Sequence, residues 1–154
     1  MPKVNPKQVE EHIGTRYPEP FDKPCNARIS KALSDAGGLT QFGVHETTLP
    51  PGKWASQRHW HSAEDEFVYI LSGTCTVIDD SGETVLKVGD CCTHKAGDPN
   101  GHHIVNNSDA DVVYLIVGTR NTRQDHCHYP DIDLDLPADG QVWRAFKHKD
   151  GSGY

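Results

Sequence analysis

The chain has 154 residues, enough for one domain with a buried hydrophobic core. Its formal net charge of −7 and pI near 5.7 argue against a nucleic-acid backbone or an anionic membrane as the main partner. No apolar run approaches the roughly 20 residues that a membrane span requires, and the N-terminus lacks the apolar stretch of a secretory signal. Five cysteines, an odd number, suit a reducing compartment better than a disulfide framework, so we expect a cytoplasmic protein.

The first part of the chain, residues 1 to about 38, is rich in charged residues and in proline. Its prolines are Pro2, Pro6, Pro18, Pro20 and Pro24. Such a segment forms little regular structure, and Gly37-Gly38 then interrupts the chain. We predict an N-terminal arm over residues 1–38 that lies over the body of the protein or over a second subunit.

From residue 39 onward the sequence indicates a succession of short strands separated by glycine-containing turns. They are predicted over 39–49, 56–61, 66–71, 74–78, 83–87, 91–95, 102–106 and 111–119, with a last one over 142–147 in the polar tail. This pattern, without a long helical stretch, predicts an all-β antiparallel sandwich or barrel that can enclose a ligand-sized cavity. Residues 39–120 would form the barrel core, and residues 121–154 a C-terminal loop and final strand.

One short stretch carries the residues that point to chemistry. His59 and His61 are two positions apart, so in an extended chain they face the same way while Trp60 faces the other. Glu66 opens the next predicted strand. Two imidazoles and a carboxylate facing one interior are ligands of a borderline-to-hard divalent metal ion. A further histidine would have to come from the second half of the chain.

These residues fall into a pattern that resembles the two motifs of the cupin superfamily. The first motif reads Gly52, six residues, His59-Trp60-His61, four residues, Glu66, six residues, Gly73. The second reads Gly89, five residues, Lys95-Ala96-Gly97, four residues, His102, three residues, Asn106. The resemblance implies a single-domain cupin jelly-roll β-barrel. It also implies that a metal ion is held by His59, His61, Glu66 and His102.

The chain departs from the second motif at the position of the third histidine. Lys95 replaces a proline, and the loop before His102 has two additional residues. His103 with Asn107 fits the same spacing, but alternation along a strand lets only one of the adjacent histidines face inward. We choose His102, because related sequences place the ligand at the first histidine of such a pair.

Other polar residues near the motif are given subordinate roles. Gln57 shares a face with His59 and is predicted to contact substrate, with a solvated strand end as the alternative. Glu64 follows His61 too closely for the motif, and Asp65 is the wrong residue type. The histidines outside the motif are expected to be ordinary surface or core residues: His45, His94, His126, His128 and His148. His126-x-His128 imitates a ligand pair but has no carboxylate partner in a predicted strand.

Three imidazoles and one carboxylate leave one or two positions open on a six-coordinate ion, as catalysis requires. Ligand type does not distinguish Fe(II), Mn, Ni and Zn. The resemblance implies a metal-dependent enzyme acting on a small oxygenated organic molecule, with dioxygenase-type oxidoreductase chemistry favoured. The alternatives are an isomerase or lyase using the same metal and a non-catalytic small-molecule-binding cupin. By analogy with small cupins we expect a homodimer with no nucleic-acid or membrane partner.

Overall fold

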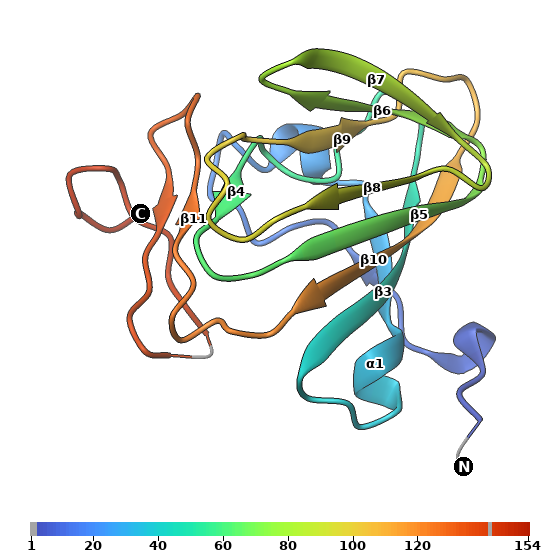
Figure 1. The fold of residues 1–154 in the computed structure, drawn as a ribbon, viewed down its shortest axis with the longest axis horizontal. Coiled ribbons are helices and arrows are strands. Elements are labelled where there is room, and N and C mark those ends of the chain that lie inside the picture. The colour runs from blue at the N-terminus through green and yellow to red at the C-terminus, as the bar shows by residue number, and fades with distance from the viewer. Residues whose placement is uncertain (1–2, 142) are drawn as a thin grey trace.

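The computed structural model describes residues 3–141 and 143–154, and most of its regular structure is strand (Figure 1). The strands are β1 (His12–Ile13), β2 (Ile29–Ala32), β3 (Phe42–Leu49), β4 (Trp60–His61), β5 (Glu66–Ser72), β6 (Thr74–Asp79), β7 (Gly82–Lys87), β8 (Cys91–His94), β9 (His103–Val105), β10 (Val112–Thr119), β11 (Cys127–His128) and β12 (Asp135–Leu136). The helical elements are α1 (Leu33–Ala36) and two 3-10 turns, Pro6–Gln8 and Lys23–Cys25. No helix among the described residues has the length and apolar character that crossing a membrane would demand.

The strands form three antiparallel sheets. The largest has the order β1-β2-β3-β10-β5-β8, and the two smaller ones have the orders β7-β6-β9 and β12-β11-β4. This confirms the predicted all-β jelly-roll class, although none of the sheets traced through the described residues closes on itself as a barrel.

The hydrophobic core lies between the six-stranded sheet and the β7-β6-β9 sheet. It is formed by Leu49, Ala55, Val68, Ile70, Cys75, Val77, Leu86, Ile104, Val112 and Tyr114. Along β5, Val68 and Ile70 are buried, whereas Phe67 and Tyr69 on the other face are more than a third exposed. Each fully buried aliphatic side chain contributes about 1.5–3 kcal/mol. Alternation therefore fixes the register of β5 and turns Glu66, two residues before Val68, toward the interior.

The N-terminal segment is more than an arm. β2 pairs with β3 from Ile29 opposite Thr48 to Ala32 opposite His45, and β1 pairs with β2. Residues predicted to lie over the body thus extend the six-stranded sheet at one edge. Part of the segment also covers a second small core of Cys127, Tyr129 and Leu134, against which Tyr17 and Phe21 pack.

Two predicted strands are much shorter than the sequence indicated. Of residues 56–61 only Trp60–His61 form a strand, because their partner β11 is itself two residues long. Within the predicted strand over 142–147, Val142 lies outside the described residues. In the remainder of that range only Lys147 pairs, through isolated bridges to Asp135 and to Gly153.

Candidate metal centre

Backbone pairing brings the two motif halves together. His59 precedes β4 and His102 precedes β9, and the two residues form an isolated antiparallel bridge. The His59 N–H donates to the His102 carbonyl at 3.1 Å, and the His102 N–H donates back at 2.8 Å. The bridge holds the two imidazoles side by side, with ring centroids 4.9 Å apart. His61 in β4 and Glu66 at the start of β5 complete the group.

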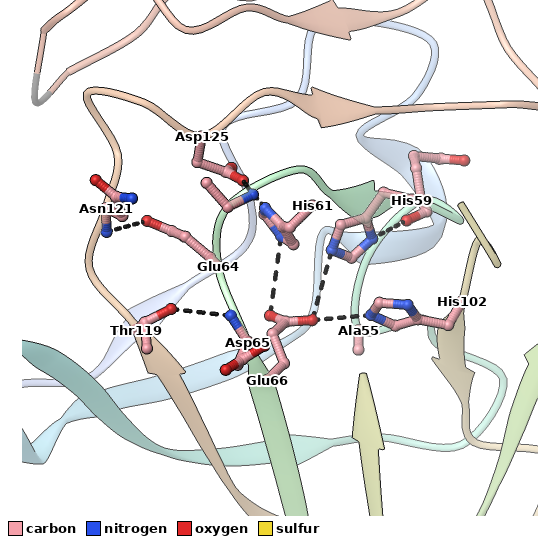
Figure 2. A network of polar contacts seen from close by, with 12 residues as sticks. Ala55, His59, His61, Glu64, Asp65, Glu66, His102, Thr119, Asn121 and Asp125 are labelled. Atoms are coloured by element: carbon pink, nitrogen blue, oxygen red, sulfur yellow. Dashed lines mark hydrogen bonds and ion pairs between the residues drawn. The ribbon is translucent and has the colours of Figure 1, made fainter. Parts of the chain in front are cut away.

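All four predicted ligands point toward one another, as Figure 2 shows. The Glu66 carboxylate lies at the centre: its Oε2 is 2.8 Å from His102 Nε2 and 4.0 Å from His59 Nε2. Its Oε1 is 4.0 Å from His61 Nε2. The four side chains are largely buried. The sequence motif therefore identifies a genuine cluster in the structure.

The neighbouring histidine, His103, faces away from this cluster. Its ring meets the Trp54 ring edge-on at a centroid distance of 4.8 Å, and its Nδ1 is 3.4 Å from the Ser56 carbonyl oxygen. Of the two candidates left open by spacing, the structure brings His102 to Glu66 and not His103.

Two of the imidazoles are held from behind by fixed acceptors. His59 Nδ1–H donates to the Gln57 carbonyl at 2.8 Å, and His61 Nδ1–H donates to Asp125 Oδ2 at 2.7 Å. Both bonds select the tautomer whose Nε2 lone pair points at Glu66, which is the usual support for a metal-binding histidine. Asp125 is fully buried and also accepts from the Ala63 N–H and from Arg144. Sequence reasoning missed Asp125, which lies 64 residues from His61 in the chain.

Burial and charge set the protonation states in the cluster. Burial lowers the pKa of His59 to about 3, so this imidazole is neutral. Burial alone would raise the pKa of Glu66, but the hydrogen bond from His102 and the neighbouring imidazoles hold it well below its usual range. Burial is the largest single influence on His61 and would lower its pKa, but the hydrogen bond to Asp125 and the neighbouring carboxylate charges together outweigh it and raise that pKa. An anionic Glu66 carboxylate thus accepts a hydrogen bond from His102 and faces the Nε2 atoms of His59 and His61.

This arrangement fits a divalent cation. Donor atoms about 2.0–2.2 Å from one ion lie roughly 3–4 Å apart, close to the 2.8–4.0 Å found between Glu66 and the three Nε2 atoms. His59, Glu66 and His102 each offer a donor atom within 4.8 Å of the other two, and His61 adjoins this group through Glu66. His102 is the less supported ligand, because its Nδ1 is buried without a hydrogen-bond partner among the described residues. The Cys127 sulfur is also within 4.8 Å of His59 and His61 donors, but burial raises the pKa of its thiol and disfavours the thiolate.

A cavity of about 380 Å³ opens beside the cluster and is lined by His61, Glu66 and His102. His94 also lines it, so the interpretation of this histidine as unrelated to the site needs correction. In the register of β5 and β8, His94 lies opposite Glu66, and its ring stacks on that of His102 with centroids 3.4 Å apart. Burial lowers the pKa of His94 to about 4 and keeps the imidazole neutral.

Glu64, which the motif spacing excluded as a ligand, lies in the cavity wall. Its Oε1 accepts from the Asn121 N–H at 2.6 Å, and burial raises the pKa of its carboxyl. It shares a neighbourhood with His61 and Asp125, with one donor or acceptor atom of each within 4.8 Å of the others. Glu64 is therefore a carboxyl group at the site that is not needed to bind metal.

Gln57 is not brought to the cavity. Its side-chain amide donates to the Phe21 carbonyl at 2.7 Å, and it is absent from the described residues that line the cavity. Its backbone carbonyl supports His59 instead. Gln57 and His59 are both buried, as alternation predicted. The Gln57 side chain, however, contacts Phe21 of the N-terminal segment and not the cavity.

Comparison with known proteins identifies the family to which this chain belongs. A sequence model of the cupin domain matches residues 45–118. A crystal structure named as a sugar phosphate isomerase of a cupin superfamily, from Silicibacter pomeroyi, is 42% identical, with 99% of this chain and 96% of that chain covered and a TM-score of 0.90. A crystal structure from Acidithiobacillus ferrooxidans, inferred by name to be a sugar phosphate isomerase, is 28% identical. The match covers 80% of this chain and 78% of that chain, with a TM-score of 0.73.

A polyketide cyclase from Streptomyces resistomycificus shares the fold, with 20% identity over 77% and 79% of the two chains and a TM-score of 0.63. At that identity the likeness carries no information on the reaction. Among curated proteins, none was found to be significantly similar in sequence.

Proposed function

This chain belongs to the cupin superfamily, and from that premise we propose that it is a metal-dependent isomerase of a small hydroxylated carbonyl compound of the sugar type. The observation that carries the proposal is a three-histidine, one-carboxylate cluster that borders a polar cavity containing a further, unused carboxyl group. The name of the 42% identical Silicibacter pomeroyi protein supports isomerisation over oxidation.

His59, His61, Glu66 and His102 would hold a divalent cation. A bound cation supplies Lewis-acid polarisation of a carbonyl or hydroxyl oxygen that reaches it from the cavity. The protein's own contribution is to keep the His59 and His61 rings oriented through Gln57 and Asp125. The surrounding burial strengthens every charge interaction at this point.

Glu64 would carry the proton. Interconversion of a hydroxyaldehyde and a hydroxyketone moves a proton from the hydroxyl-bearing carbon to the former carbonyl carbon, while the hydroxyl proton passes to the former carbonyl oxygen, with no net oxidation. A carboxylate in the cavity wall, whose pKa burial raises toward neutrality, is suited to accept and return that proton. The Asn121 N–H fixes one carboxylate oxygen and leaves the other for the substrate.

The cavity lining favours hydroxyl groups over a strongly anionic group. Lys95 is the one lysine or arginine among the described lining residues, whereas Asp79 and Asp98 both contribute carboxylates. His94, neutral at physiological pH, and Asn100 offer hydrogen bonds to hydroxyl groups. We therefore propose a polyhydroxy carbonyl substrate that the cation and these groups anchor.

Proton exchange with solvent tests the proposal. The protein purified without chelator is assayed for metal content, then incubated in D₂O with free aldoses and ketoses and, separately, with their phosphates. NMR should show isomerisation with deuterium at the carbon next to the carbonyl. Glu64→Gln should lower this rate about 10²–10⁴-fold with metal content unchanged. Glu83→Gln, an exposed carboxylate on β7 outside the cavity, is the matched control.

The same protein separates the alternatives predicted from the sequence. Iron-dependent oxygen uptake that is lost in His61→Ala, with no deuterium incorporation from any sugar, would contradict the isomerase and support a dioxygenase. Tight ligand binding without turnover under any metal would instead support a non-catalytic binding protein.

A further inference from the structure

A second group of imidazoles lies on the opposite face of β11 from the metal centre. β11 pairs with β4, where Cys127 lies opposite His61 and His128 opposite Trp60. Cys127 is buried on the His61 side, so alternation turns His126 and His128 the other way. Pairing with β12 then places Asp135 opposite His128. His126 and His128 thus have a carboxylate partner in a neighbouring strand, Asp135, which the sequence did not predict.

The three side chains are close enough to share one ion. His126 Nε2 is 2.7 Å from Asp135 Oδ1. The rings of His126 and His128 lie nearly parallel, with centroids 3.8 Å apart, and the Trp60 ring stacks on His128 at 4.1 Å. One potential ligand atom from each of the three residues lies within 4.8 Å of the other two.

A simple histidine–aspartate hydrogen bond is the competing explanation, and the chain contains one for comparison. His148 is 2.7 Å from Asp133 and stacks on Tyr154 at 3.9 Å, just as His128 stacks on Trp60. Among the described residues, no second imidazole offers a ligand atom within 4.8 Å of both members of that pair. What distinguishes the β11 group is His128, whose ring forms no hydrogen bond within the described part of the chain.

The chemistry of the three side chains also fits a ligand role. Two imidazoles and a carboxylate are a ligand set for first-row divalent transition metals, with the remaining positions taken by water. The partial exposure of His126 and Asp135 leaves room for that water.

We propose that His126, His128 and Asp135 form a second divalent transition-metal site, the outer site, separate from the cluster around Glu66. An ion there joins β11 to β12 and stabilises the C-terminal segment. The outer site does not depend on the proposed enzymatic activity, because it shares no residue with the cavity.

Isothermal titration calorimetry of the chelator-stripped full chain with Ni²⁺ tests this proposal. The wild type should bind two ions per chain. His59→Gln/His102→Gln should remove one and leave the outer site's Kd unchanged. Asp135→Asn, which preserves side-chain shape, and His128→Gln should each raise the outer site's Kd at least about 10-fold. Replacing a residue that only supports a metal ligand already lowers metal affinity about 10–100-fold, and these two residues are proposed as ligands.

His148→Asn is the matched control and should still bind two ions, since it removes a histidine–aspartate pair without a second imidazole. Thermal melts give an independent reading: added Ni²⁺ should raise the Tm of His59→Gln/His102→Gln but not of that protein carrying Asp135→Asn as well. Unchanged stoichiometry and melting in Asp135→Asn and His128→Gln, or an equal loss in His148→Asn, would overturn the outer site.

Discussion

Two imidazole clusters lie on opposite faces of the short β4–β11 pairing, and they differ in what stands behind them. In the inner cluster the His102 and Glu66 side chains are 7% and 16% exposed, whereas in the outer group His126 and Asp135 are 33% and 24% exposed. Inner imidazoles are oriented by the Gln57 carbonyl and by the buried Asp125. The outer rings are held by stacking alone, apart from the contact with Asp135 that a metal would use.

This difference shows that the function of a metal site depends on the burial and orientation of its ligands as well as on their residue types. Buried, oriented ligands lose little freedom when they bind an ion, and their low-dielectric surroundings suit them to polarise a substrate. Partly exposed ligands at two adjacent short strands would bind a more labile ion, whose effect would be on local stability. We therefore assign chemistry to the inner cluster and stabilisation to the outer one.

The largest effect is expected from Glu66→Gln. This change removes the anionic charge at the centre of three imidazoles while keeping the shape of the side chain. Metal content of the inner site should fall to background and isomerase turnover should be lost. Metal analysis of His148→Asn, prepared in parallel, shows the unperturbed value. A Glu66→Gln protein that retained metal and turnover would refute the inner site.

Asp125→Asn should weaken the inner site without removing a ligand. The amide has one accepting oxygen where the carboxylate has two, so it cannot serve both His61 Nδ1–H and the Ala63 N–H, and metal affinity should fall about 10–100-fold. Arg144 also loses its buried ionic partner, and loss of one member of a buried pair typically costs about 3–5 kcal/mol of folding free energy. Calorimetry and urea unfolding measure the two losses separately. Asp135→Asn is the control, and inner-site affinity should be unaffected by it.

Removal of metal from the inner site should lower stability by a moderate amount. An ion present at 100 times its Kd stabilises the folded state by about 2.7 kcal/mol. For a domain of this size that corresponds to a Tm decrease of roughly 5–10 °C on addition of chelator. Differential scanning fluorimetry measures it, with His59→Gln/His102→Gln as the reference in which the inner contribution is absent. An equal Tm decrease in that reference would show that the stabilisation by metal does not come from the inner site.

The comparison also explains what the sequence could and could not predict. His59, His61 and Glu66 lie within eight positions, so strand alternation and motif spacing placed them together before the fold was known. The carboxylate partner Asp125 and the cavity residue His94 depend on which strands pair, β4 with β11 and β5 with β8. Asp135 likewise meets His126 only because β11 and β12 are neighbours. Local patterns carry no signal for such pairings.

The smallest effect is expected from Asp135→Asn in the absence of metal. Because Asp135 and His126 are partly exposed, loss of their hydrogen bond should change the free energy of unfolding by less than about 1 kcal/mol. Urea unfolding in the presence of chelator measures this baseline. Ni²⁺ should then widen the gap between wild type and variant, because only the wild type retains the outer site. A large loss without metal, comparable to that of Asp125→Asn, would mean that both faces of β11 depend on their carboxylates for folding, and the contrast between the two clusters would disappear.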